Sequence, residues 1–342
     1  MATWFDESRL DDEEVWQRAD ARLRALAESG ARVRREAIEA SEALGLAVER
    51  AAELSRPRAV IAAGPDSRLL RVVLEPWCPV PFVAWPHPSL PGWAGGLDLV
   101  VVLAPDGGHS SASAVAEAVR RGCQLVVACP PSSTVAEHAG GRWSTILPTA
   151  SGDQLATAVV VLDYLERVRL GPRVDVERVA EALDEVAITC SPHRDLAVNP
   201  AKVLAIAMAD VTPVVWGGSV LAARAARRIA ESLRRASGRS ALAGDAEHLL
   251  PVLEAVAPRD VFDDPFADEP RERRPMLLVL DDGSQEPIVR EDRGRLQAAA
   301  AARGVRVETL TTEAPTEVAR YASLLLSGSY AAEYLRLGLV ED

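Results

Sequence analysis

From residue 58 onward, short apolar segments alternate with longer segments of helical periodicity. Most of the apolar segments end in a loop rich in Gly, Pro, Asp or Ser, and a helical segment follows. This alternation is typical of parallel sheets with helices on both faces, so we expect an α/β fold. The expected strands are 58–63, 79–85, 97–103, 124–129, 144–147, 212–216, 276–280 and 305–310.

The helical segments follow the same logic, since apolar residues recur in them at intervals of three and four. Acidic residues at 11–14 favour a helix start there. A second helix is expected from about 33 to 54, with a buried stripe of Ile38, Ala40, Leu44 and Val48. The charged segment 260–274 contains proline and is expected to be an exposed loop. Further helices are expected at 69–74, 112–121, 155–169, 176–186, 201–208, 220–235, 291–303 and 315–337.

The two halves of the chain repeat this plan, and 342 residues suit two domains. We expect N-terminal helices at 1–57 that pack on the first domain. The first α/β domain, with its bridging helices, is expected at 58–195 and the second at 196–342.

The net charge of the chain limits which partners it is expected to bind. The chain has 38 Lys and Arg against 50 Asp and Glu, a formal net charge of -12. This balance argues against nucleic acid or an anionic membrane as the main partner. The acidic, polar N-terminus does not resemble a signal peptide, and the longest apolar run, 97–105, is too short to cross a bilayer.

The four cysteines predict a reducing environment. Cys78, Cys123, Cys129 and Cys190 lack the spacing of a zinc site, and no metal is expected. Cys123 and Cys129 lie in apolar surroundings, which favours buried free thiols. Together with the N-terminus, these features predict a cytoplasmic protein.

Three loops could hold a ligand, because open parallel sheets bind ligands beyond the carboxyl ends of their strands. Backbone amides, helix dipoles and hydroxyls there can form an anion site. Ordinary helix capping is the alternative, since Ser and Asp are preferred caps and no loop has a phosphate-binding fingerprint. The candidate binding residues are Gly64, Ser67, Asp106, Gly107, His109, Ser110, Ser111, Gly218 and Ser219.

A family resemblance follows from two motifs. Asn199-Pro-Ala-Lys-Val-Leu-Ala205, followed by Thr212-Pro-Val-Val-Trp-Gly-Gly-Ser219, resembles the middle of the bifunctional phosphoglucose/phosphomannose isomerases, which have tandem sugar-isomerase (SIS) domains. The segment from Leu324 to Leu335 resembles the last helix of that family. The resemblance implies two SIS domains, each a parallel sheet flanked by helices in a phosphoglucose-isomerase-like sandwich. It also implies a homodimer, a small sugar or sugar phosphate as ligand, and no metal or nicotinamide cofactor.

The same resemblance implies aldose–ketose isomerisation of hexose 6-phosphates, but several motifs differ from the family pattern. Ser67 matches a serine that contacts the sugar. Asp106 and His109 replace hydroxyl residues of the phosphate loop, the family's arginine motif has no arginine here, and its C-terminal lysine is missing. The catalytic stretch falls near Glu247 and His248, the candidate general base and ring-opening acid. The alternative for this pair is a solvated helix face.

Among these differences, the carboxylate of Asp106 has the largest expected effect on phosphate binding. At about 5 Å and an effective dielectric of about 20, its carboxylate repels each unit of ligand charge by about 3 kcal/mol. A helix N-terminus returns only about 1 kcal/mol. Unless His109 is protonated or an arginine folds over the loop, phosphate binding there is therefore expected to be weak. The alternative function is a catalytically degenerate SIS protein that acts as a sugar-ligand sensor or partner subunit.

Two further residues, Lys202 and Trp216, each have a structural and a functional interpretation. Lys202 is the only lysine of the chain, and a structural contact with a carboxylate or a helix end is favoured over catalysis. Trp216 ends a strand beside a Gly-Gly-Ser turn, where it could line a pocket or pack in the core; packing is the commoner role.

Overall fold

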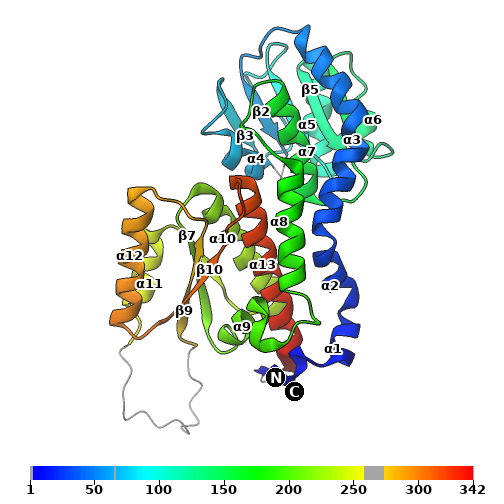
Figure 1. Ribbon diagram of the computed structural model, residues 1–342. Coiled ribbons are helices and arrows are strands. Elements are labelled where there is room, and N and C mark those ends of the chain that lie inside the picture. Colours follow the sequence, from blue (N-terminus) through cyan, green and yellow to red (C-terminus); the bar gives the residue numbers. More distant parts are fainter. Residues whose placement is uncertain (1–2, 65–66, 258–272, 342) are drawn as a thin grey trace, which may run out of the picture. The chain divides into compact units, whose positions relative to one another are not determined.

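The computed structural model describes residues 3–64, 67–257 and 273–341 (Figure 1). The chain divides into two compact units: Ser29–Glu181, and a second unit that joins Met1–Glu28 to Ala182–Asp342. The sequence-based boundaries kept residues 1–57 together, whereas the compact units divide this segment after Glu28.

The Ser29–Glu181 unit contains a five-stranded sheet with the order β3-β2-β4-β5-β6, and every pairing in it is parallel. The parallel α/β architecture predicted from the sequence is confirmed. Because β3 and β4 lie on opposite sides of β2, the strand order reverses between β2 and β4. The strands are β2 (Val60–Ala63), β3 (Phe82–Trp85), β4 (Leu99–Leu103), β5 (Gln124–Cys129) and β6 (Ser144–Pro148). The helices are α3 (Ser29–Ala52), α4 (Ser67–Leu74), α5 (His109–Arg120), α6 (Thr134–His138) and α7 (Gln154–Arg167).

The central strands of this sheet are buried on both faces. Every residue of β2 and β4 is buried, as expected where helices cover both sides of a parallel sheet. Helices α5 and α6 pack on one face against Ile61, Val100 and Val127. Only 4% of the chain is aromatic, so this core consists mainly of Ala, Val and Leu.

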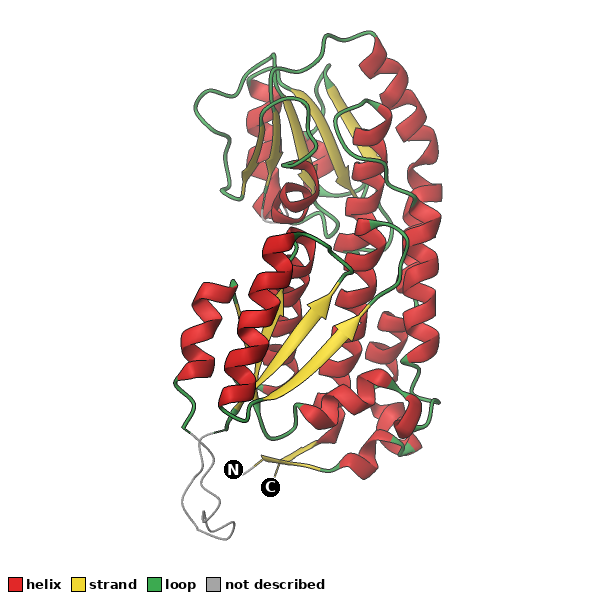
Figure 2. Ribbon diagram, turned by 60° about the vertical axis from the view of Figure 1, so that its left-hand side comes forward, coloured by secondary structure: helices red, strands yellow, loops and turns green. Residues whose placement is uncertain are grey.

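The second unit contains a four-stranded parallel sheet with the order β10-β9-β7-β8. Helices α11 and α12 cover one face and α10 and α13 cover the other (Figures 1 and 2). A two-stranded antiparallel sheet pairs β1 (Thr3–Phe5) with β11 (Leu339–Glu341). The parallel strands are β7 (Thr212–Gly217), β8 (Leu242–Ala243), β9 (Pro275–Asp281) and β10 (Arg306–Thr311).

The helices of the second unit include short N-terminal ones. They are η1 (Glu7–Leu10), α1 (Glu13–Arg18), α2 (Asp20–Ala27), η2 (Leu196–Val198), α9 (Pro200–Ala207), α10 (Val220–Ser237), α11 (Ala246–Glu254), α12 (Pro287–Ala302) and α13 (Glu317–Gly338). Helix α8 (Val176–Thr189) carries the chain from the first unit into the second. No helix of the described segments is long and apolar enough to cross a membrane.

The predicted buried stripe of α3 is confirmed at Ala40 and Leu44, but Ile38 is 74% exposed and Val48 is only half-buried. The buried side of α3 contains Val33, Glu36, Ala40 and Leu44 instead. Hydropathy predicts that Ile38 is buried in preference to Glu36, but hydrogen bonds stabilise Glu36 in the buried position. The expected loop at 260–274 lies almost entirely outside the described residues.

Glu36 attaches α3 to the loop between β6 and α7. Its side chain is fully buried, and its carboxylate accepts hydrogen bonds from the backbone N–H groups of Ala150 at 2.9 Å and Ser151 at 2.6 Å. The Ser151 hydroxyl donates to the same carboxylate. One turn away, Arg32 forms an ion pair of 2.7 Å with Asp153. Several donors therefore compensate the burial of this charge.

The cysteines are free, as the sequence predicts. Cys123, Cys129 and Cys190 are buried, and Cys78 is half-buried. Burial raises the pKa of the Cys190 thiol to about 11.

Replacing Glu36 by Ala leaves buried N–H donors without an acceptor, so we expect it to lower the free energy of unfolding by about 3 kcal/mol. The matched control is Glu39→Ala on the exposed side of the same helix, which we expect to change it by less than about 0.5 kcal/mol. Urea unfolding of both variants measures the difference. Equal losses would show that Glu36 contributes nothing specific.

Candidate functional site

Two loops meet at the carboxyl edge of the five-stranded sheet. Strand β2 leads into Gly64 and β4 leads into the Asp106 loop, on either side of the point where the strand order reverses. Gly64 has a φ of +89°, and a Cβ added there would lie 3.0 Å from the Ser111 hydroxyl oxygen. A reversal of this kind is where open α/β sheets hold their ligands. The structure therefore brings predicted residues from both loops together.

Two buried donors near Gly64 have no hydrogen-bond partner in the described part of the chain. The first is the hydroxyl of Ser67, a residue only 1% exposed at the start of α4. The second is the indole N–H of Trp85, which ends β3 and whose carbonyl accepts from the Gly64 N–H at 3.0 Å. An unpaired buried polar group costs about 1–3 kcal/mol. An additional acceptor at either of these donors would therefore be stabilising.

The Asp106 loop uses its own carboxylate at the start of α5. Asp106 is exposed, and its Oδ1 accepts from the Gly108 N–H at 3.1 Å. Gly108 is the N-cap of α5 and has no side-chain cap of its own. The preceding Gly107 has a φ of +65°, and a Cβ there would lie 2.5 Å from the Ser133 Cβ, so this turn requires glycine.

The first turn of α5 contributes the other predicted residues of this edge. His109 is exposed, and Ser111 is 2% exposed with its N–H donating to the Gly108 carbonyl. Ser110 lies between them in the helix. Since Asp106 already occupies a helix N-terminal amide, a ligand anion there would meet a carboxylate. A hydroxyl or ammonium group fits this position better.

The second sheet also reverses its strand order, between β7 and β9, and its polar groups there are paired within the chain. The Ser219 hydroxyl accepts from the Ala222 N–H at 3.0 Å, as the N-cap of α10, and donates to the Asp282 carboxylate. A Cβ on Gly218 would lie 2.3 Å from the Val289 Cγ1. Gly218 and Ser219 thus lie at the predicted edge, with tight packing and internal hydrogen bonds.

Asp281 strengthens the same edge. It ends β9 and forms an ion pair of 2.7 Å with Arg293 of α12. Burial acts to raise the pKa of Asp281, but hydrogen bonds from Arg293 and the Gly283 N–H outweigh it, so the pKa lies below its ordinary value. The carboxylate is therefore ionised at neutral pH and fixes the loop after β9.

Glu247 and His248, the predicted catalytic pair, lie in the first turn of α11. Both are exposed, and neither side chain forms a hydrogen bond or ion pair with another described residue. Leu249, Leu250 and Leu253 point into the core beneath them. This is the arrangement of a solvated helix face, and the catalytic roles remain predictions.

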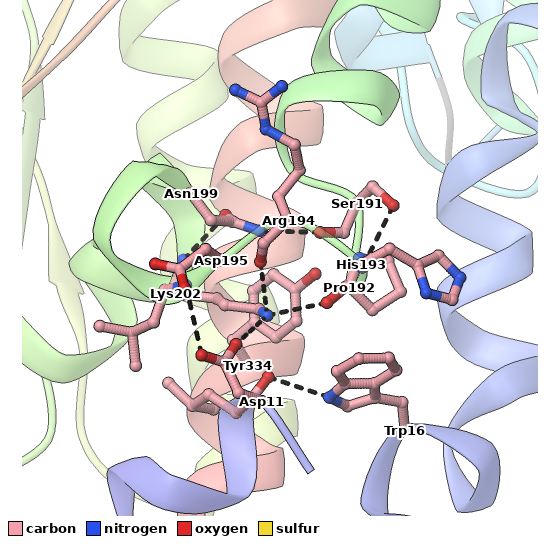
Figure 3. Close-up of polar contacts among 12 residues, drawn as sticks. Asp11, Trp16, Ser191, Pro192, His193, Arg194, Asp195, Asn199, Lys202 and Tyr334 are labelled. Atoms are coloured by element: carbon pink, nitrogen blue, oxygen red, sulfur yellow. Dashed lines mark hydrogen bonds and ion pairs between the residues drawn. The ribbon is translucent and has the colours of Figure 1, made fainter. Parts of the chain in front are cut away.

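Lys202 has a structural role, as the sequence analysis favoured. The residue is completely buried, and its Nζ donates to Asp11 Oδ1 at 2.6 Å, to the Pro192 carbonyl at 2.8 Å and to the Arg194 carbonyl at 2.9 Å (Figure 3). These contacts use all three N–H donors of the ammonium group. The Nζ also lies 5.6 Å from the centre of the Tyr334 ring.

The residues around Lys202 hold it in place. Asn199 caps α9 through its Oδ1, which accepts from the N–H groups of Ala201 and Lys202, and its Nδ2 donates to the Ser191 carbonyl at 3.0 Å. Pro200 occupies the first position of the helix, where its missing N–H costs nothing. The Asn-Pro-Ala-Lys motif is thus a helix cap followed by a buried cation. Trp216 is 2% exposed within the core, so its packing role is confirmed.

Residues 197–338 match the family model of the bacterial phosphoglucose isomerase C-terminal SIS domain. No curated protein sequence matches the chain. The match begins just before the Asn-Pro-Ala-Lys motif and extends through α13, so this SIS domain falls within the second unit.

Solved structures extend the likeness to nearly the whole chain. Tagatose-6-phosphate ketose/aldose isomerase from Escherichia coli is 12% identical, with 91% of this chain and 92% of that chain covered and a TM-score of 0.65. The C-terminal domain of glucosamine-fructose-6-phosphate aminotransferase from Francisella tularensis is 11% identical, with 93% and 96% covered and a TM-score of 0.62. At these identities the likeness concerns the fold. The chain has the α/β fold of phosphosugar-isomerase-like SIS proteins.

Sequence reasoning overlooked two side chains at the carboxyl edge of the first sheet. Trp85 was not among the candidate site residues, yet its N–H is unpaired among the described residues. Thr149, directly after β6, is 4% exposed and its hydroxyl is also unpaired there. The available signal was position: each residue lies at the carboxyl end of a strand.

Replacing Lys202 by Met keeps the length of the side chain but removes all three hydrogen bonds. We expect the free energy of unfolding of the second unit to fall by about 3 kcal/mol, because two backbone carbonyls lose their donor. Asp11→Asn should lower the free energy of unfolding by less, about 1 kcal/mol, because Asp11 is exposed and Lys202 keeps its two carbonyl partners. Denaturant unfolding tests this order, and a Lys202→Met protein as stable as the wild type would contradict the structural role.

Proposed function

We propose that this protein binds a small sugar phosphate or a related sugar at the carboxyl edge of its five-stranded sheet. The observation that carries the proposal is the buried Ser67 hydroxyl, unpaired among the described residues, beside the reversal of strand order. The SIS-domain match over 197–338 supports a ligand of this class. In this proposal the ligand contacts Gly64, Ser67, Asp106, Gly107, His109, Ser110 and Ser111, with Gly218 and Ser219 as the corresponding residues of the second sheet.

The reaction we propose is aldose–ketose isomerisation of a hexose 6-phosphate, of the phosphoglucose/phosphomannose isomerase type. The E. coli structural neighbour is a phosphosugar ketose/aldose isomerase, which supports this class of reaction. Isomerisation needs a base that moves the C2 proton and an acid that opens the ring. We assign these roles to Glu247 and His248, and we propose a cytoplasmic homodimer that needs no metal or nicotinamide.

A second function is favoured by one contact. The Asp106 carboxylate occupies the Gly108 N–H, so the α5 terminus is less able to hold a phosphate. A protein that binds its sugar ligand without turnover, as a sensor or partner subunit, would have this arrangement. Measurements of turnover and binding separate the two functions.

For turnover, we expect the purified protein to convert fructose 6-phosphate in a coupled assay. Glu247→Gln should lower kcat by roughly 100-fold to 10,000-fold, the usual loss for a general base. The control is Glu254→Gln, an exposed glutamate at the other end of α11, which should leave kcat unchanged. A wild-type protein without activity at high concentration would refute the isomerase assignment.

For binding, we expect a phosphosugar to raise the melting temperature of the wild type, and Ser67→Ala to abolish the rise. A ligand at 100 times its dissociation constant stabilises a protein by about 2.7 kcal/mol. Asp106→Ser should tighten phosphosugar binding by about 100-fold or more, since it removes a repulsion of about 3 kcal/mol for each unit of ligand charge. If Asp106→Ser leaves the affinity unchanged, the electrostatic argument is wrong. Stabilisation by ligand without turnover would favour the sensor.

A further inference from the structure

A hollow of about 380 Å³ lies in the Ser29–Glu181 unit at the amino end of its sheet, the edge opposite the proposed sugar site. The first residues of β4 and β5, Leu99 and Gln124, form part of its wall. The rest comes from the end of α3, the following segment 54–57, and the end of α7 with residues 168–170. Its size is within the usual range for small-molecule sites.

The charge of this hollow is opposite to that of the whole chain. Its lining residues include Arg56 and Arg169 but no Asp or Glu, whereas the chain has 50 acidic residues against 38 basic ones. Neither guanidinium forms a hydrogen bond or ion pair with another described residue. Many other arginines of this unit are paired, for example Arg34 with Glu177 at 2.8 Å and Arg58 with Asp98 at 2.7 Å. The hollow thus has two positive charges without a partner carboxylate on its wall.

The backbone of Arg169 is unusual. Its φ of +60° lies in the left-handed region, and Arg169 is the only non-glycine with a positive φ among the described residues. It follows the C-cap of α7, a position where glycine is usual because a side chain strains the backbone there. Glycine would cap the helix equally well. What arginine adds is an exposed cationic side chain at the wall of the hollow.

Two neutral donors complete the wall. Tyr164 is 5% exposed, and its hydroxyl has no partner among the described residues. Burial raises the pKa of Tyr164 to about 12, so the phenol remains protonated. The Gln124 side-chain amide is also unpaired within the described chain. Arginines near helix ends commonly offset the helix dipole, but that role leaves the phenol and the amide unexplained.

We propose that this hollow is a second ligand site, which binds the phosphate monoester of a small organic molecule. Guanidinium groups hold phosphate oxygens through paired N–H donors, and the phenol and amide supply further donors. The organic part of the ligand would lie against Leu99 and Leu54. The site shares no residue with the proposed sugar site and does not depend on that assignment.

The test measures melting temperature against concentration for inorganic phosphate, a hexose phosphate and a nucleoside monophosphate, at constant ionic strength with chloride as reference. We expect saturable stabilisation by phosphate beyond that by chloride, and tighter binding of one of the two esters, which identifies the organic part. Arg56→Gln and Arg169→Gly should each weaken phosphate binding at least tenfold. Arg169→Gly also relieves the left-handed strain, so its loss of binding cannot be attributed to unfolding.

The matched control is Arg173→Gln, an exposed arginine four residues beyond Arg169 that does not line the hollow. It should bind phosphate like the wild type, and so should Ser67→Ala, which alters only the opposite edge. The proposal fails if phosphate acts no better than chloride. It also fails if the effect survives in both arginine variants, or if Ser67→Ala abolishes it.

Discussion

The second unit depends on one buried ammonium group. Lys202 reaches Asp11 near the N-terminus and the carbonyls of Pro192 and Arg194, while the ring of Tyr334 in α13 lies close by. A charge removed from water needs all of its donors satisfied, so these segments must come together for the unit to form. This contact is one physical reason why Met1–Glu28 belongs to the same compact unit as the C-terminal half, and the pairing of β1 with β11 is another.

The two sheets differ in how the polar groups at their carboxyl edges are paired. At the reversal between β7 and β9, Ser219 pairs with Asp282, and Asp281 pairs with Arg293, so the polar groups satisfy one another. At the reversal between β2 and β4, the Ser67 hydroxyl and the nearby Trp85 N–H lack partners among the described residues. An edge whose polar groups are already paired has less to gain from a ligand, which is why we assign the sugar site to the first sheet.

The alternation of strands and helices was readable from the sequence because covered parallel strands must be apolar along their whole length. The sequence did not show which side of α3 is buried, because Glu36 is buried through hydrogen bonds to residues more than 100 positions away. Strand β8 has only two residues, Leu242 and Ala243, and shows no pattern. Candidate loops could be named, but whether the Ser67 hydroxyl is paired depends on tertiary geometry. The same holds for the hollow that joins Arg56 to Arg169.

The burial of Lys202 has a consequence for covalent modification of the folded protein. Since it is the only lysine and is completely buried, no side-chain amine is open to acetyl transfer, ubiquitin conjugation or amine-directed labels. A reagent can reach Lys202 only after the second unit has opened locally. The extent of amine labelling at this residue is therefore a direct measure of local unfolding around α9.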